Sequence, residues 1–455
     1  MSTILPNALI QRLGNDPFFD KEGFLAAHHA DDKLTSVRIN PEKPSPLLFP
    51  LDHQVPWCPT GYYLEERPAF TLDPLFHAGC YYVQEASSMF LSHIIAVLGL
   101  DSKAVRALDC CAAPGGKSTL LNARLSKDSL LVANEIIKNR AIVLKENHVR
   151  WGTANVVVSH NDPSAFKRLP GFFDLLLVDA PCSGSGMFRK DEQSIDKWSE
   201  AAVKLCVERQ QRILSQVLES LASDGYLLYS TCSYSQEENE DMVDWLISTY
   251  NLESVPIPVD AEWNIKETQS VKHQGYGYRF YPHLTKGEGF FISVLRASGT
   301  RSSFSLKKMK SDKQAVSPKD LKGWIEEPQR FVTLVHHQVV HFFPEAHELS
   351  VKALQQVLYL KNAGTIAGKW LGKELVPAHD LAMSVHAEDA LPFVDVELDV
   401  AREFLRKKML DVSLFSSIKK GWCMVKFNGV SLGWVKVLGQ RVNNYYPNDV
   451  RIAHL

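Results

Sequence analysis

Short apolar runs alternate with amphipathic segments through the middle of this 455-residue chain, and this alternation restricts the possible folds more than any other feature. The expected strands cover residues 105–111, 130–135, 154–159, 174–180 and 226–232. The expected helices cover residues 118–125, 138–151, 199–222 and 237–250. Strands and helices that alternate at this spacing favour βαβ units. We therefore predict an α/β fold with a doubly wound, mainly parallel sheet.

The segments on either side of this core divide the chain further. Residues 1–75 form a small mixed region with two short helices, one strand and a proline-rich connection, and the core occupies 76–298. Residues 299–385 comprise a basic linker and an intermediate module, since 301–323 hold seven basic but two acidic side chains. Residues 386–455 carry short strands between turn residues and form a β-rich end. We predict four parts in this order.

Composition and charge exclude several classes of protein. No apolar stretch approaches the roughly 20 residues that a membrane helix needs, and the N-terminus lacks a secretory pattern. The eight cysteines include neither a CxxC pair nor a Cys/His cluster at zinc spacing, so we expect free thiols, no metal and a cytoplasmic protein. The net charge of -2 does not indicate nucleic acid binding, although an overall charge near zero can hide a local basic stripe.

The segment Cys111-Ala112-Ala113-Pro114-Gly115-Gly116-Lys117 joins the first expected strand to the first expected helix. Glycine lets the backbone approach a ligand, and the helix N-terminus offers free amide donors. The segment is not a P-loop, because Cys111 stands where glycine is required. Glu135, at the end of the second strand, suits ribose hydroxyls, and Asp162, after the third, suits an adenine amino group. Because no basic cluster frames the turn, we favour S-adenosylmethionine over a phosphorylated cofactor.

Two cysteines follow buried strands in similar settings. Cys182 lies in Asp179-Ala180-Pro181-Cys182, and Cys232 lies in Ser230-Thr231-Cys232-Ser233. In an open α/β sheet, chemistry collects outside the carboxyl ends of the strands. Two thiols at that edge indicate a reaction with two sulfur-dependent steps.

Methylation of a pyrimidine ring at C5 fits such a pair. C5 of cytosine is a poor nucleophile until a thiolate adds at C6, after which C5 can attack a sulfonium methyl group. Asp179 precedes Cys182 by three residues and would stabilise the adduct near ring N3. The residues alone leave open which of Cys182 and Cys232 attacks.

These three motifs resemble the signatures of the Sun/Fmu (RsmB/RsmF, NSUN) family of RNA cytosine-5 methyltransferases, over residues 1–296. Residues 187–191 resemble the RsmF-like branch, which acts on small-subunit ribosomal RNA. Residues 433–436 and 443–447 resemble the PUA-like RNA-binding end of that branch. The resemblance implies a Rossmann-like methyltransferase core, a small N-terminal RNA-binding region and a C-terminal PUA-like region.

The resemblance also assigns roles to individual residues. It implies that residues 111–117, Glu135, Asp162 and Asp179 hold S-adenosylmethionine. It implies that Cys232 is the nucleophile and that Cys182 assists proton removal or product release. Cytosine methyltransferases that act on DNA instead attack with the cysteine after a proline, which would nominate Cys182. The implied substrate is a cytidine of 16S ribosomal RNA, free or in the small subunit, and we expect a monomer.

Three basic side chains are candidates for RNA contact. Arg38 matches an N-terminal RNA-facing motif of the family. Arg189 and Lys190 follow the Cys182 loop and would hold the backbone of a nucleotide flipped out of its stack.

Three other functions are compatible with parts of this pattern. The same chemistry directed at tRNA is one, and an RNA-binding assembly factor without catalysis is another. The presence of all the expected reactive residues disfavours the second. An amino-directed methyltransferase is the third, but such enzymes commonly carry an Asp/Asn-Pro-Pro-aromatic loop where this chain has Asp179-Ala180-Pro181-Cys182.

Overall fold

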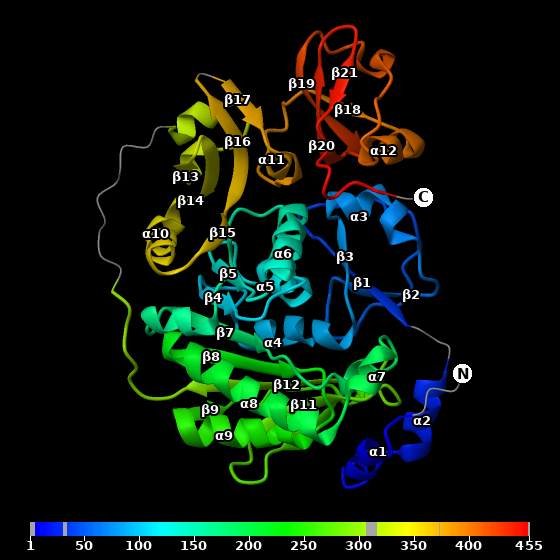
Figure 1. The fold of residues 1–455 in the computed structure, drawn as a ribbon, viewed down its shortest axis with the longest axis vertical. Coiled ribbons are helices and arrows are strands. Elements are labelled where there is room, and N and C mark those ends of the chain that lie inside the picture. Colours follow the sequence, from blue (N-terminus) through cyan, green and yellow to red (C-terminus); the bar gives the residue numbers. More distant parts are fainter. Residues whose placement is uncertain (1–4, 31–33, 306–315, 373, 454–455) are drawn as a thin grey trace.

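A mixed sheet of ten strands forms the centre of the protein (Figure 1). The computed structural model describes residues 5–30, 34–305, 316–372 and 374–453. The strand order is β10-β11-β12-β8-β7-β4-β5-β6-β15, and β9 pairs with β12. The parallel strands are β4 (Arg106–Asp109), β5 (Leu130–Asn134), β6 (Val156–Ser159), β7 (Phe173–Asp179) and β8 (Leu221–Thr231). The predicted doubly wound α/β core is confirmed.

Helices cover both faces of this sheet. One face packs against α4 (Leu91–Val97), α5 (Gly116–Arg124) and α6 (Lys138–Trp151), and the other packs against α8 (Glu200–Val217), α9 (Glu240–Tyr250) and α10 (Glu348–Val357). Successive residues of β7 alternate between the two layers. Leu175 and Leu177 belong to the first, whereas Leu176 and Val178 belong to the second. Burial on both faces explains why this strand is apolar from Leu175 to Val178.

The order of the strands places the functional loops. From β4 the chain builds β5 and β6 on one side, then returns to place β7 and β8 on the other. The carboxyl ends of all five parallel strands lie at one edge, and the direction of winding reverses between β4 and β7. Ligands of open α/β sheets bind at such a reversal. A hairpin of β11 (Tyr276–Phe280) and β12 (Phe290–Ala297) extends the sheet with β9 (Leu252–Ser254) and β10 (Lys266–Gln269).

The N-terminal region combines short helices with a small sheet. Helices α1 (Asn7–Leu13) and α2 (Lys21–His29) pack on the core through Phe24, whose ring lies 5.3 Å from that of Tyr234. The three-stranded sheet has the order β2-β1-β3. The sheet consists of β1 (Thr35–Ile39), β2 (Gly61–Leu64) and β3 (Tyr81–Val83), and the short helix α3 (Pro74–Ala78) precedes β3. The other short helix, α7 (Gln193–Lys197), belongs to the core.

Two four-stranded sheets follow the core. The first contains β13 (Phe331–His336), β14 (Val339–Pro344), β16 (Thr365–Leu371) and β17 (Glu374–Pro377). The second contains β18 (Phe393–Asp395), β19 (Gly421–Phe427), β20 (Val430–Val437) and β21 (Val442–Asn444). Helices α11 (His379–Met383) and α12 (Leu398–Leu405) accompany them. Of the expected basic linker, Lys307, Lys308, Lys310 and Lys313 lie outside the described residues.

These C-terminal sheets are joined to the rest of the protein. Strand β15 (Leu360–Ala363) pairs antiparallel with β6, so the intermediate module contributes a strand to the core sheet. The last sheet shares an apolar cluster with the N-terminal region, in which Val37 and Leu75 meet Phe404 and Val435. Figure 1 shows these two terminal regions on the same side of the core. None of the described helices has the length and apolarity needed to cross a bilayer.

Candidate active site

The turn after β4 is held by side chains of α6. Gly115 has φ of +120°, and a Cβ added there would lie 3.3 Å from Cβ of Asn147. The Asn147 side chain donates to the Pro114 carbonyl at 2.7 Å, and Arg140 donates to the Ala113 carbonyl at 2.6 Å. A positive φ of this kind is easy only for glycine. The backbone of the turn is therefore fixed in one conformation ahead of the N-terminus of α5.

The two acids predicted to follow β5 and β6 lie at the same edge of the sheet as this turn. Glu135 is 3% exposed and accepts a hydrogen bond of 2.9 Å from the amide of Ile137. Asp162 is exposed and accepts from the amide of Ser164 at 2.9 Å, and hydrogen bonds from Ser164 lower the pKa of its carboxyl group. Their contact with a cofactor stays a prediction.

Asp109, the last residue of β4, is an acid that the sequence motifs did not single out. It is 1% exposed, and neither carboxyl oxygen has a hydrogen-bond partner of normal geometry among the described residues. Burial and the nearby charge of Asp179 raise the pKa of Asp109 well above its ordinary value. The carboxyl group of Asp109 therefore holds its proton more strongly than an ordinary aspartate does, and it lies buried beside the turn.

Asp179 connects the turn to the two cysteine-bearing strands. Its Oδ2 lies 2.9 Å from Nζ of Lys117 in the first turn of α5, and its Oδ1 accepts a hydrogen bond of 2.8 Å from the hydroxyl of Ser230 in β8. Burial opposes the charge of Lys117, but Asp179 outweighs it, so the pKa of Lys117 is raised. The start of α5 and the ends of β7 and β8 thus meet at one carboxylate.

The two cysteines face each other across the ends of β7 and β8. Their Sγ atoms lie 2.9 Å apart, and the amide of Cys232 donates to Sγ of Cys182 at 3.3 Å. The hydrogen bond with Cys232, followed by burial, raises the pKa of Cys182 well above the ordinary value. Cys182 therefore retains its proton beside the other thiol. This arrangement suits one attacking sulfur and one proton-bearing sulfur, and the roles of the two cysteines stay a prediction.

Arg38, which the sequence predicted to contact RNA, is buried in this structure. The side chain is 1% exposed, donates to Gln84 at 2.8 Å and to Thr119 at 2.6 Å, and its guanidinium carbon lies 4.4 Å from the centre of the Trp151 ring. It joins the N-terminal sheet to α5 and α6, while its Nη1 is buried without a hydrogen-bond partner among the described residues. Contact of Arg38 with RNA stays a prediction.

We expect Arg38→Met to destabilise the protein by about 2–3 kcal/mol, because Gln84 and Thr119 lose a buried charged donor. Urea unfolding measures this difference, and Arg67→Met, at an exposed arginine, should change stability by less than about 0.5 kcal/mol. RNA affinity of the folded variant should equal that of the wild type. Unchanged stability together with weaker RNA binding would restore the role that the sequence suggested.

The other two candidates for RNA contact differ in exposure. The side chain of Arg189 is 13% exposed and lies 3.6 Å from the carboxylate of Glu288, which is 3% exposed. Lys190 is exposed. Of the two, Lys190 is the side chain whose position suits a phosphate contact, and that contact stays a prediction.

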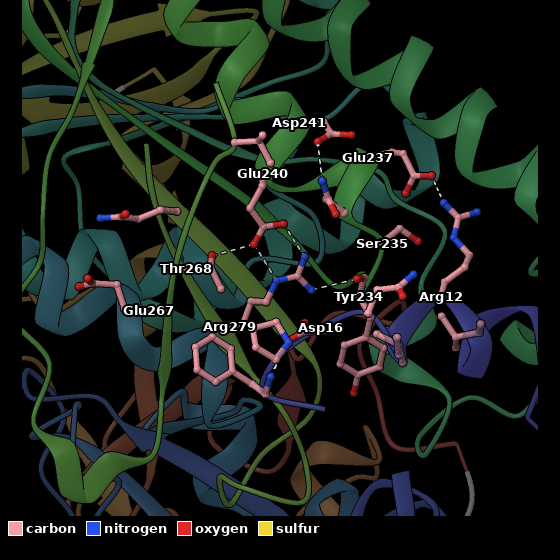
Figure 2. A pocket seen from close by; sticks show the side chains of 18 of the residues that line it. Arg12, Asp16, Tyr234, Ser235, Glu237, Glu240, Asp241, Glu267, Thr268 and Arg279 are labelled. Carbon is pink, nitrogen blue, oxygen red and sulfur yellow. Dashed lines mark hydrogen bonds and ion pairs between the residues drawn. The ribbon is translucent and has the colours of Figure 1, made fainter. Parts of the chain in front are cut away.

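A cavity of about 870 Å³ lies behind the Cys232 loop, between α1, the start of α9 and the β10–β11 hairpin (Figure 2). Its walls carry more acidic than basic groups, and neither Cys182 nor Cys232 lines it. The acidic walls do not suit RNA phosphates. Across the described ranges, no group of three or more His, Cys, Asp or Glu side chains is placed to hold a metal ion.

Three family models match the chain, and together they follow its architecture. Residues 97–296 match "16S rRNA methyltransferase RsmB/F". Residues 5–86 match "N-terminal domain of 16S rRNA methyltransferase RsmF", and residues 392–452 match "Methyltransferase RsmF PUA domain". The predicted resemblance is confirmed.

Individual proteins agree with these matches. The ribosomal RNA small subunit methyltransferase F of Shewanella piezotolerans is 31% identical over 422 residues, which cover 87% of this chain and 85% of the relative. A methyltransferase homologue from Pyrococcus horikoshii is 28% identical, with a TM-score of 0.51 over 64% of this chain and 100% of that protein. NSun6 from the same organism, solved with SFG, shares the fold, with 20% identity and a TM-score of 0.53 over 66% of this chain and all of that protein. The chain therefore belongs to the RsmB/F family of 16S rRNA methyltransferases, in the group that carries the RsmF N-terminal and PUA domains.

Proposed function

We propose that the protein transfers a methyl group from S-adenosylmethionine to C5 of a cytidine in 16S ribosomal RNA, through a covalent bond between Cys232 and C6. The observation that carries the proposal is the meeting of two thiols at the carboxyl edge of the sheet, with their Sγ atoms 2.9 Å apart. Family membership supports the cofactor and the substrate, since the matched models and relatives are named as 16S or small-subunit rRNA methyltransferases.

The residues around the turn fit S-adenosylmethionine. Gly115 has a backbone conformation that only glycine adopts easily, and it lets the turn pack against Asn147 of α6 ahead of the N-terminus of α5. Glu135 retains a buried carboxylate at the end of β5, the position from which acids hold ribose hydroxyls. Asp109 offers a polar group without a partner of normal geometry. When bound there, the cofactor supplies an electrophilic methyl group on a sulfonium.

The chain's own residues would perform the remaining steps. Sγ of Cys232, reacting as the thiolate, would form a bond to C6 of the cytosine, and the electron pair of the C5–C6 double bond would move to C5. C5 would then take the methyl group from the sulfonium, which would leave as a neutral thioether. Asp179 lies at this edge and would stabilise the ring at N3. After methyl transfer, the C5 proton leaves to a base, the double bond forms again, and the bond between Cys232 and C6 breaks. Cys182 would assist proton removal or release of the product.

We also propose the form of the substrate, the compartment and the oligomeric state of the enzyme. The substrate is 16S rRNA, free or assembled in the small subunit, and the enzyme acts in the cytoplasm as a monomer. We also propose that the chain is divided into four parts, at 1–75, 76–298, 299–385 and 386–455. The PUA-type sheet and the small N-terminal sheet are the proposed RNA-binding parts, because both lie on the same side of the core (Figure 1).

Methyl transfer to defined RNAs tests this function. Purified protein should move labelled methyl groups from S-adenosylmethionine onto unmodified 16S rRNA or small subunits, and nucleoside analysis should identify 5-methylcytidine. Label on tRNA alone would favour the tRNA-directed alternative. Label on an exocyclic amino group would favour the amino-directed alternative. If wild type and Cys232→Ala rescued a ribosome-assembly defect equally, the protein would be an RNA-binding factor without catalysis.

A further inference from the structure

A buried carboxylate lies between the two cysteine loops and has no role in the mechanism so far. Glu238 is 0% exposed. Its Oε2 accepts hydrogen bonds from the hydroxyls of Ser183 at 2.6 Å and Ser233 at 2.5 Å, and its Oε1 accepts from the amide of Ser183 at 2.9 Å. Ser183 directly follows Cys182, and Ser233 directly follows Cys232. One carboxylate therefore joins two loops that are fifty residues apart in sequence.

Gln210 on α8 extends this contact to the start of the Cys182 loop. Its side-chain amide donates to Oε1 of Glu238 and to the carbonyl of Pro181, both at 3.2 Å. Gln210 is 0% exposed, so its polar atoms depend on these partners. Tyr229 in β8 donates to the backbone carbonyl of Glu238 at 2.6 Å, which fixes the main chain at this point.

The two residues that follow Glu238 hold the Cys232 loop from its other side. The Asn239 side chain accepts from the Thr231 hydroxyl at 2.6 Å and donates to the Ser233 carbonyl at 2.8 Å, so it brackets Cys232. Arg279 bonds the Glu240 carboxylate and donates to the Tyr234 carbonyl at 2.9 Å, as Figure 2 shows. Three consecutive side chains thus fix residues 231–234.

We infer that Glu238 is a positioning residue, whose carboxylate sets the relative placement of Cys182 and Cys232 through Ser183 and Ser233. Burial of a charge is costly unless several donors satisfy it, and three of the four donors here come from the cysteine loops. The negative charge also contributes to the raised pKa of Cys182, after the hydrogen bond with Cys232 and burial. A shift of about 1 Å at a reacting group can cost about 100-fold in rate. The inference rests on the proposed function, because the two sulfurs are its reacting groups.

Glu238→Gln tests the inference, because it removes the charge and keeps the shape. We expect kcat to fall about 10- to 100-fold, with KM for S-adenosylmethionine within about 2-fold of the wild type, since the cofactor turn is not touched. The matched control is Glu237→Gln, because the carboxylate of Glu237 pairs with Arg12 in the cavity that neither cysteine lines (Figure 2). It should keep the wild-type kcat.

A second readout does not depend on activity. Iodoacetamide labelling at fixed pH, followed by peptide mass spectrometry, gives the alkylation rate of each cysteine in the free protein. In Glu238→Gln the rate at Cys182 should rise about 5-fold or more, because loss of the nearby negative charge lowers its pKa. Ser233→Ala makes a smaller change at the same contact and should lower kcat in the same direction. If Glu238→Gln does not fold, Ser233→Ala is the variant to be measured in its place.

Wild-type kcat and unchanged labelling of Cys182 in Glu238→Gln or Ser233→Ala would overturn the inference. Equal losses of kcat in Glu238→Gln and Glu237→Gln would do the same, because they would reflect general destabilisation. Absence of methyl transfer by the wild type would instead count against the proposed function. In that case the labelling rates would still report whether Glu238 controls the two thiols.

Discussion

Cys232→Ala should lose methyl transfer to RNA by at least about 1,000-fold, which corresponds to about 4 kcal/mol of transition-state stabilisation. The loss is large because C5 of cytosine does not attack a methyl group until a nucleophile has added at C6. Binding of S-adenosylmethionine should be unchanged, since Cys232 is not among the residues proposed to hold the cofactor. Single-turnover methyl transfer and equilibrium cofactor binding give the two quantities.

Cys423→Ala is the matched control for this variant. Cys423 is also a free cysteine, but it is buried in β19, in the apolar cluster of the last sheet. Its replacement should leave kcat unchanged. Near-normal transfer by Cys232→Ala would mean that another group attacks the ring, and Cys182 would be the first to examine.

Asp179→Asn should lower kcat by about 100- to 1,000-fold, the usual effect of removing one preorganised electrostatic group from an active site. The change keeps the shape of the side chain, but it leaves Lys117 without its negative partner, and it removes the acid proposed to act at N3. Because Asp179 raises the pKa of Lys117, the ion pair is complete below the ordinary lysine pKa. It is lost only as pH rises through the raised value. The defect should therefore be the same throughout the neutral range.

Kinetics on the same RNA provide the measurement, with Asp241→Asn, at an exposed acid of α9, as the control. Lys117→Met should reduce activity in the same direction, because it removes the other half of the pair. A Lys117→Met variant with normal kcat would limit the role of Asp179 to its contact with the base and with Ser230.

Periodicity in the sequence predicted the core well because its strands are buried on both faces. The runs that end at Asp109 and Asp179 are mostly apolar, and the loops that follow them carry the distinctive residues. Strand order then brings those loops to one edge without further information. The two cysteines could be found for the same reason, since Cys232 directly follows a strand and Cys182 comes three residues after one.

Contacts between distant segments were not predictable in this way. The acidic stretch 237–240 has the composition of a solvent-exposed helix start, yet Glu238 is enclosed by serines from two loops. Arg38 belongs to a motif expected to face RNA, but it packs against Trp151. Strand β15 reaches the core sheet from a segment that looked independent. In each case the environment of the residue depends on a partner more than forty residues away, and local periodicity does not encode that partner. Only Ser233, five residues before Glu238, is a local partner among these contacts.

A trapping experiment tests the central claim most directly, because it detects the bond between Cys232 and the base. Wild type, Cys182→Ala and Cys232→Ala are incubated with S-adenosylmethionine and unmodified 16S rRNA, separated on denaturing gels, and any attached RNA is sequenced. The account predicts RNA bound covalently to Cys182→Ala alone, with one cytidine at the attachment site. RNA bound only to Cys232→Ala would exchange the roles of the two thiols. No adduct on either variant, together with no methyl transfer by the wild type, would contradict the two-cysteine mechanism.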